Sequence, residues 1–240
     1  MDDWNAHVRP HGPLQELAPN LWQVTGVGRP LDRTMVIWRM PDGGLWLHSA
    51  VALTDAGMQE LDLLGPVRVM VAPNRYHRMD CAVYKARYPS AKLVAPRAAR
   101  SQVEKVAAVD ADAEDFLPAC GIRVHVPRGT RPGELVYEVP LNDGAALVCA
   151  DLLFNIPDAG GGFHGFVLKH VTLSVGPLGV SRIFRLLVLQ DRAVYADWVA
   201  SLGEIPSLRV LSVAHGLAIT DRVGDALRTA ATGIRNRVRG

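Results

Sequence analysis

The sequence predicts an α/β protein in which two β-sheets pack face to face and helices cover the outside. Short apolar stretches bounded by glycine, proline and asparagine dominate residues 21–48 and 122–150, as is typical of strands. Stretches that favour helices lie between these regions and after the second one. The resulting order is β-rich, βαβαβ, β-rich and then αβα, which fits two sheets with outer helices.

The first half of the chain begins with three successive strands, at residues 21–25, 34–40 and 44–48, with a hairpin-type turn at 41–44. A helix is expected over 53–64, because Thr54 is a suitable N-cap and Gly65-Pro66 stops it. The next elements are a strand at 67–71, a helix at 82–88 and a strand at 92–95. Residues 97–120 are expected to form a helix with an acidic loop at 110–115.

The second half begins with strands at 122–126, 134–139 and 145–150. Asn142-Asp-Gly144 between two apolar runs is a strong signal for a hairpin. A glycine-rich loop at 157–162 and a mostly apolar stretch to residue 189 follow. Helices are expected at 193–202 and 223–238, and a strand at 208–213 leads directly into Ala214-His-Gly216.

Composition narrows the function classes. The 240 residues contain no repeat or long linker, so one domain over 1–240 is expected. A net charge of +2 gives no support for a nucleic-acid or membrane partner, and a small-molecule substrate or ligand is expected. Three cysteines without a C-x-x-C pair, and no signal peptide or membrane-length apolar run, predict reduced thiols and a cytoplasmic location. The apolar run 184–189 fits either core or the face of a homo-oligomer.

Several motifs resemble the metallo-β-lactamase superfamily over residues 17–220. Residues 17–22 (LAPNLW) resemble its opening strand, and residues 43–49 (GGLWLHS) resemble its strand that ends in an acidic turn. Residues 149–154 (CADLLF) are similar to its G-D-x-x-F, whose aspartate bridges two metal ions, and residues 212–216 (SVAHG) to its last histidine motif. The resemblance, closest to an uncharacterised branch, implies a four-layer αβ/βα sandwich with its site along one edge.

The metal-binding motif of that superfamily is degenerate in this chain. The early loop T-H-x-H-x-D-H corresponds to residues 73–79, and the position of the later G-H-T-P-G histidine holds Thr130. Of the usual ligands, Asp151 and His215 remain, and both are good metal ligands. The ligand positions of the early loop hold four other residues, Asn74, Tyr76, Arg78 and Met79.

The first functional hypothesis is a hydrolase with a reduced, mononuclear site. If the early loop is rotated by one position, His77, Asp151 and His215 form a set of two histidines and one carboxylate. The cofactor is then one zinc, iron or manganese ion, and the reaction is attack of metal-activated water on an ester, amide or thioester carbonyl. Asp151 and His215 are the expected catalytic residues, with Tyr76 or Asn74 orienting the oxyanion.

The second hypothesis is a non-catalytic member that binds a small ligand or a partner chain and holds no metal. Arg78 then pairs with Asp151 and replaces the metal as the positive group. A nucleophilic triad of Ser49, His77 and Asp151 has the right residue types, but the chain lacks a G-x-S-x-G elbow. Four further residues are weaker candidates for the site: His48, Asp80, His164 and His170.

Overall fold

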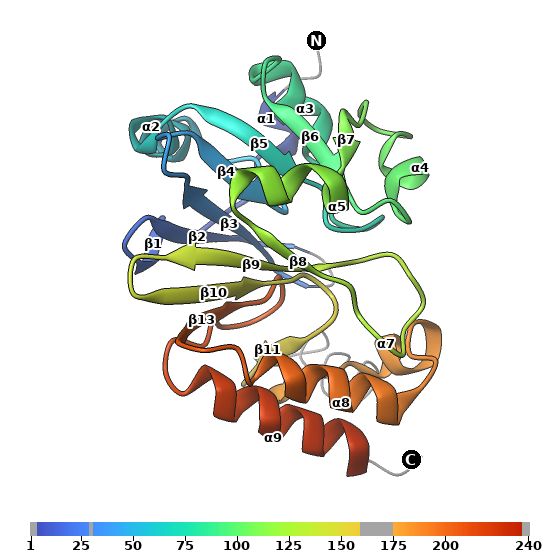
Figure 1. Cartoon of the computed structure of the whole chain (residues 1–240). Coiled ribbons are helices and arrows are strands. Elements are labelled where there is room, and N and C mark those ends of the chain that lie inside the picture. Colours follow the sequence, from blue (N-terminus) through green and yellow to red (C-terminus); the bar gives the residue numbers. More distant parts are fainter. Residues whose placement is uncertain (1–3, 29–30, 159–174, 237–240) are drawn as a thin grey trace.

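The computed structural model describes residues 4–28, 31–158 and 175–236, and these residues form four layers (Figure 1). Two β-sheets face each other in the middle of the molecule, with helices above the first sheet and below the second. The first half of the chain builds one sheet with its helices, and the second half builds the other. The predicted α/β sandwich is confirmed.

The first sheet has seven strands in the order β1-β2-β3-β4-β5-β6-β7. Each strand from β1 to β4 pairs antiparallel with the next, and each strand from β4 to β7 pairs parallel with the next. The predicted change from hairpins to βαβ units requires this change of direction. The strands are β1 (Gln15–Ala18), β2 (Leu21–Gly26), β3 (Arg33–Arg39), β4 (Leu45–His48), β5 (Val67–Val71), β6 (Lys92–Ala95) and β7 (Ala111–Asp112).

The second sheet has four strands in the order β13-β10-β9-β8. The predicted Asn142-Asp-Gly144 hairpin is confirmed, since β9 and β10 pair antiparallel on either side of it, and β10 pairs parallel with β13. A two-stranded ribbon, β11 with β12, lies beside it. The strands are β8 (Arg123–His125), β9 (Val136–Leu141), β10 (Gly144–Val148), β11 (Phe154–Ile156), β12 (Gly176–Gly179) and β13 (Leu208–Ser212).

The helices cover the outer faces and the edge of the sandwich. Thr54 caps α2 by accepting a hydrogen bond from the Gly57 backbone N–H, as predicted. The structure corrects the long helix expected at 97–120, where two short helices, a two-residue strand and a 3-10 turn follow one another. The helices are α1 (Trp4–His7), α2 (Asp55–Leu64), α3 (Cys81–Arg87), α4 (Arg100–Val103), α5 (Ala113–Phe116), η1 (Leu117–Cys120), α7 (Arg182–Leu187), α8 (Arg192–Leu202) and α9 (Val223–Asn236).

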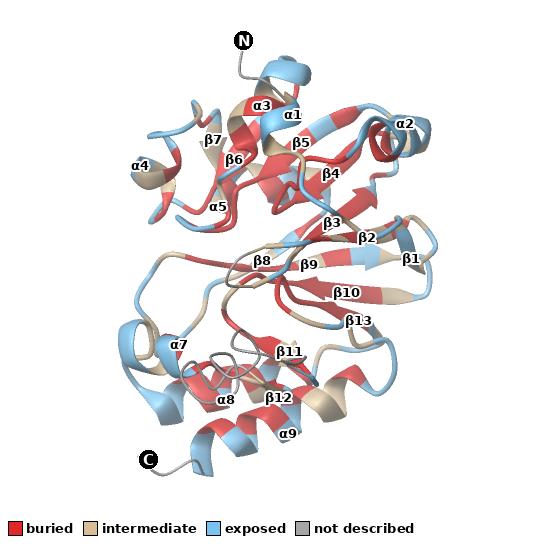
Figure 2. Cartoon of the chain, turned by 180° about the vertical axis from the view of Figure 1, so that it is seen from behind, coloured by how far each residue is buried: buried red, intermediate tan, exposed pale blue. Residues whose placement is uncertain are grey.

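Three apolar cores separate the four layers, and strand alternation assigns side chains to them (Figure 2). In β4, Leu45 and Leu47 face the helices, whereas Trp46 between them faces the second sheet. In β10, Val148 faces the first sheet, and Leu147 faces the layer of α8 and α9. Among the described residues, no helix combines the length and apolar character that crossing a bilayer requires.

Candidate metal and active site

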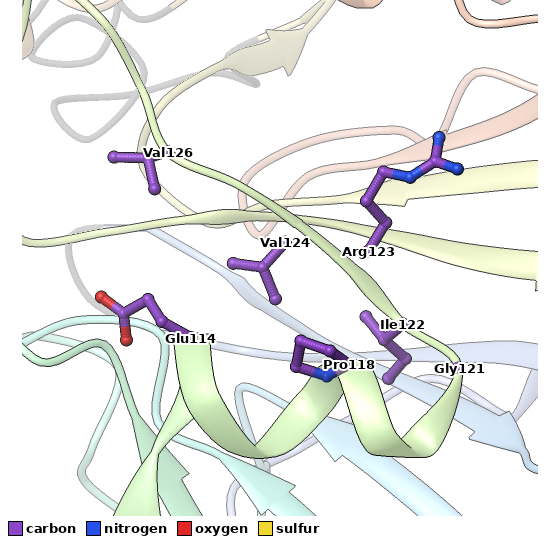
Figure 3. A pocket seen from close by; sticks show the side chains of 7 residues that line it. All are labelled: Glu114, Pro118, Gly121, Ile122, Arg123, Val124 and Val126. Atoms are coloured by element: carbon purple, nitrogen blue, oxygen red, sulfur yellow. The ribbon is translucent and has the colours of Figure 1, made fainter.

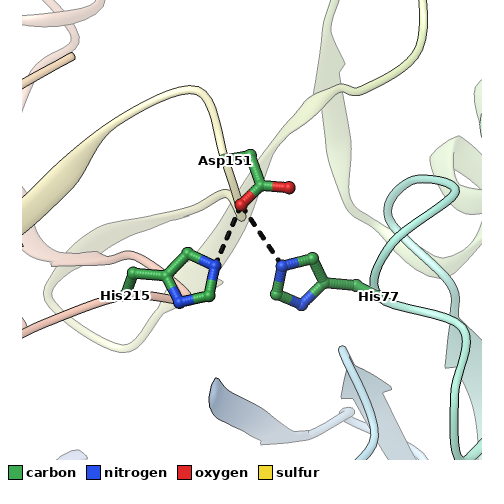
Figure 4. A group of neighbouring side chains, drawn as sticks. All are labelled: His77, Asp151 and His215. Carbon is green, nitrogen blue, oxygen red and sulfur yellow. Dashed lines mark hydrogen bonds and ion pairs between the residues drawn. The ribbon is translucent and has the colours of Figure 1, made fainter. Parts of the chain in front are cut away.

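Three side chains from the ends of three strands meet at one edge of the sandwich (Figure 4). His77 lies in the loop after β5, Asp151 follows β10, and His215 follows β13. The Nε2 atoms of His215 and His77 lie 3.0 Å and 3.3 Å from the same oxygen, Asp151 Oδ1. One ligand atom from each residue lies within 4.8 Å of the other two, which is close enough for a single ion to bind all three.

Strand pairing explains why Asp151 and His215 meet. The strands β10 and β13 are parallel neighbours in which Val148 lies opposite Ser212. Asp151 and His215 each follow three residues after this pair. Because parallel strands end at the same sheet edge, the two side chains leave the sheet together. The ring of His215 then stacks on Phe154 at a centroid distance of 5.3 Å, which fixes its plane.

The second ring nitrogen of each histidine is also held. Nδ1 of His215 donates to the backbone carbonyl of Asp32 at 2.6 Å, and Nδ1 of His77 lies 2.8 Å from Ser49 Oγ. In a neutral imidazole, a proton on Nδ1 leaves the Nε2 lone pair free for a metal ion. Both histidines therefore have the supporting contacts that are usual for metal ligands, and both are almost fully buried.

Ser49 itself adopts an uncommon backbone conformation. Its φ angle of 59° lies in the left-handed region, directly after the last residue of β4. This conformation costs a non-glycine residue about 1–2 kcal/mol, so it persists because the surrounding structure imposes it. The triad types predicted for Ser49, His77 and Asp151 do lie in line, but Ser49 is 0% exposed. Since substrate does not reach a fully buried hydroxyl, Ser49 orients His77 and is not a nucleophile.

Asp151 is held as an anion. Burial alone raises the pKa of its carboxyl, but the charge of His77 and the hydrogen bonds from His215 and His77 more than reverse this and lower the pKa well below its usual range. Its second oxygen, Oδ2, accepts a hydrogen bond from Asn74 Nδ2 at 2.8 Å. The side chain keeps 26% of its surface exposed, so Asp151 is the part of the site that faces solvent.

Asn74 sets the conformation of the loop that carries His77. Its side-chain oxygen accepts the backbone N–H groups of Tyr76 at 2.8 Å and of His77 at 3.1 Å, an Asx-type turn. Asn74 is buried, and its amide is fully engaged, so it does not serve as the predicted oxyanion donor. The turn directs His77 inward, into the position for which the sequence suggested Arg78.

Glu134 belongs to the site and was not predicted from the sequence. Its carboxylate is buried and accepts hydrogen bonds from Asn74 Nδ2 and from the backbone N–H groups of Ala150, Asp151 and Leu152. Burial and then the charge of Asp151 raise the pKa of Glu134 to about 8, against the opposing effect of these donors. Glu134 therefore fixes the turn that presents Asp151.

One predicted interaction is wrong. Arg78 forms no ion pair with Asp151, because Asn74, His77 and His215 already take the carboxylate oxygens, and Arg78 Nη1 is buried without a hydrogen-bond partner. Tyr76, which was expected to orient the oxyanion, is 56% exposed, and its ring lies under the guanidinium of the neighbouring Arg75.

The weaker candidates lie outside the ligand group. Asp80 is a structural anion, since its buried carboxylate pairs with Arg33 at 2.7 Å and with His7 at 3.1 Å. His48 is buried between the sheets and stacks on Trp46. The two remaining histidine candidates, His164 and His170, fall outside the described residues.

A surface hollow of about 560 Å³ lies between η1 and β8 and shares no residue with the ligand group (Figure 3). Its charged residues already have partners: Arg123 pairs with Glu138, and Glu114 accepts the backbone N–H of Arg97. The hollow therefore offers no converging free polar groups, and the chemistry belongs to the edge where His77, Asp151 and His215 meet.

Comparison with known proteins supports the fold. No protein-family model matches the sequence, and no curated protein matches it significantly. Among solved structures, the DIM-1 metallo-β-lactamase exposed to ceftazidime superposes with a TM-score of 0.62 at 12% identity, covering 94% of this chain and 99% of that one. A metallo-β-lactamase from Hirschia baltica gives 0.59 at 13% identity, covering 95% and 100%. The FIM-1 metallo-β-lactamase from Pseudomonas aeruginosa, in its mono-zinc form, gives 0.58 at 12%, covering 96% and 99%. The chain has the fold of the metallo-β-lactamase superfamily.

Proposed function

We propose that this protein is a metal-dependent hydrolase whose site holds one divalent ion through His77, Asp151 and His215. The observation that carries the proposal is the convergence of two histidine Nε2 atoms on one carboxylate oxygen, at 3.0 Å and 3.3 Å. Two histidines and one carboxylate that leave coordination positions open are typical of catalytic metal sites. The similar FIM-1 structure, described in a mono-zinc form, supports the view that this fold accommodates a single ion.

The donor set fits an ion on three counts. The histidines are held at Nδ1 by Ser49 and by a backbone carbonyl, so both Nε2 atoms are directed toward Asp151. The Asp151 carboxyl has a pKa well below its usual range, so at neutral pH it supplies the anion that a cation requires. The three ligand atoms lie within 4.8 Å of one another, so a single ion would bind all three residues.

The residues of this chain supply positioning and charge. A divalent ion supplies Lewis-acid chemistry, which lowers the pKa of water and polarises a carbonyl group. The buried rings of His77 and His215 exclude water from one side of the site, whereas Asp151 faces solvent and leaves that side open to a substrate. We infer that the reaction is hydrolysis of an ester, amide or thioester of a small molecule.

Metal analysis of freshly purified protein tests the proposal. The wild type is expected to carry close to one equivalent of zinc, iron or manganese, and Asp151→Asn and His215→Ala are expected to lose it while remaining folded. His125→Ala is the matched control, because this histidine lies on β8, bonded to Glu138, outside the ligand group. Loss of metal from the control as well, or a folded wild type that binds no added zinc, iron or manganese, contradicts the proposal.

Activity is the second readout. Stoichiometric metal is expected to accompany hydrolysis of a panel of activated esters, thioesters and amides, and the rate is expected to follow metal content when metal is removed and restored. A protein that binds one equivalent and hydrolyses none of these compounds refutes the catalytic half of the proposal.

A further inference from the structure

The side-chain amide of Asn74 lies between two carboxylates. Its Nδ2 donates to Glu134 Oε2 at 2.7 Å and to Asp151 Oδ2 at 2.8 Å, so each of its two hydrogens has a carboxyl oxygen as its acceptor. The orientation of the amide is determined by its surroundings, because Oδ1 accepts the backbone N–H groups of Tyr76 and His77. The reverse orientation would place the amide oxygen against two carboxylates and leave two buried donors without acceptors.

The two oxygens of Asp151 therefore face two different groups. Oδ1 lies against the Nε2 atoms of His77 and His215, whereas Oδ2 lies against the Asn74 amide. On the far side of that amide, Glu134 supplies a second carboxyl group. The amide thus occupies a position between two carboxylate oxygens, where a small cation would otherwise be favoured.

We propose that Asn74 limits this site to one metal ion, because its amide NH₂ group occupies a second cation position formed by Glu134 and Asp151. The inference rests on the proposed function for the role of Asp151 Oδ1, and it assigns Glu134 as a positioning residue. It also identifies the chemical class that the second position takes once the amide is removed. With aspartate at position 74, three carboxylates would face this second position, those of residues 74, 134 and 151. Such a set selects a hard divalent cation that prefers oxygen ligands, such as Mn²⁺, Mg²⁺ or Ca²⁺.

The substitution Asn74→Asp tests the proposal by changing one donor group. The side-chain oxygen that holds Tyr76 and His77 is kept, and the NH₂ group becomes an oxygen facing Glu134 and Asp151. Three carboxyl groups at such distances repel one another unless a proton or a cation binds between them. Asn74→Asp is therefore expected to bind one more equivalent of Mn²⁺ than the wild type, measured by titration with detection of free Mn²⁺ by electron paramagnetic resonance.

Asn74→Leu is the matched control, because it has a similar volume and offers neither a donor nor a ligand. It is expected to bind no additional Mn²⁺. The double variant Asn74→Asp/Glu134→Gln keeps two carboxylates, and it is expected to bind the additional ion at least about tenfold more weakly than Asn74→Asp. Equal stoichiometry in Asn74→Asp and Asn74→Leu overturns the proposal.

The outcome is separable from that of the proposed function. The first equivalent in the wild type tests the set of His77, Asp151 and His215, and the difference between Asn74→Asp and Asn74→Leu tests the second position. If Asn74→Asp is unfolded without metal, circular dichroism during the Mn²⁺ titration is the readout. Recovery of the wild-type spectrum supports the proposal, and a chain that stays unfolded at saturating Mn²⁺ overturns it.

Discussion

Replacing His48 by phenylalanine is expected to make the protein less sensitive to acid. The His48 ring is 1% exposed, stacks on Trp46 at 5.7 Å and meets Tyr137 edge-on at 5.5 Å, and its Nε2 has no hydrogen-bond partner. Burial, and then the charge of His77, lower the pKa of His48 from 6.5 to about 3, against a smaller opposing effect of Asp151. The imidazole is therefore neutral in the folded protein.

The sign and size of the effect follow from proton linkage. Between pH 6.5 and about 3 the unfolded chain binds a proton at His48 and the folded chain does not. The free energy of unfolding therefore falls as the pH is lowered through this window, by about 1.4 kcal/mol per pH unit from this one group. From pH 7.5 to pH 4.5 the loss from His48 is about 3 kcal/mol, and phenylalanine in its place removes it.

Urea unfolding followed by far-ultraviolet circular dichroism, between pH 7.5 and 4.5, measures the effect. Subtracting the wild-type curve from that of His48→Phe cancels the contributions of the other titrating groups. Near pH 7.5 the variant is expected to be at least as stable as the wild type, because phenylalanine keeps the ring contacts and removes an unpaired buried nitrogen.

The control variant is Trp46→Phe, which changes the same ring cluster without changing a titrating group. Its cost is expected to be the same at every pH. If the stability of His48→Phe falls with acid as steeply as that of the wild type, the neutral, buried state of His48 is refuted.

Three further predictions concern Ser49, Asp80 and Tyr195. Ser49→Ala is expected to weaken metal binding about 10–100-fold by freeing His77 Nδ1. Ser49→Gly should weaken metal binding as much as Ser49→Ala does. It should unfold at a higher urea concentration than Ser49→Ala, because the φ of 59° at position 49 suits glycine. Equal urea midpoints for the two variants would contradict backbone strain at this position. Asp80→Asn should cost about 3–5 kcal/mol in urea unfolding, since it breaks a buried pair with Arg33, whereas Asp62→Asn at an exposed pair should cost below about 1 kcal/mol. Tyr195→Phe should cost about 1–3 kcal/mol in thermal unfolding by leaving the buried Leu152 carbonyl unpaired, and an unchanged midpoint would count against that bond.

The fold was predictable because it depends on patterns that the sequence carries locally. Alternation in β4 places Leu45 and Leu47 on one face and Trp46 on the other, and the structure shows the same division. The strands that precede Asp151 and His215 were also predictable, and the structure pairs them in parallel, so that the two residues leave the second sheet together. The prediction of a helix at 97–120 was wrong, because the short helices and the 3-10 turn found there depend on tertiary packing more than on local sequence pattern.

The early loop could not be predicted from alignment by motif. The family spacing places Arg78 beside Asp151, whereas a loop rotated by one position places His77 there. In the structure, the Asn74 side chain accepts the N–H groups of Tyr76 and His77, which tightens the turn and directs His77 toward Asp151. A side-chain hydrogen bond of this kind shifts the register of a loop by one residue, and the identities of the ligands shift with it.

The position of Glu134, by contrast, could have been predicted from the register of the strand pair once the hairpin at Asn142-Asp-Gly144 is assigned. The two-residue turn at Asn142-Asp143 pairs Leu141 with Gly144, and the ladder continues without a shift to the pair of Tyr137 and Val148. Three further steps along both strands place Glu134 opposite Asp151, where it accepts the Asp151 backbone N–H at 2.9 Å. A carboxylate opposite a carboxylate in an apolar ladder requires donors between them, and a buried asparagine is the neutral side chain that donates to both at once. The same register argument requires Asn74 and Glu134 to change together, since replacing either residue alone leaves a buried polar group without its partner.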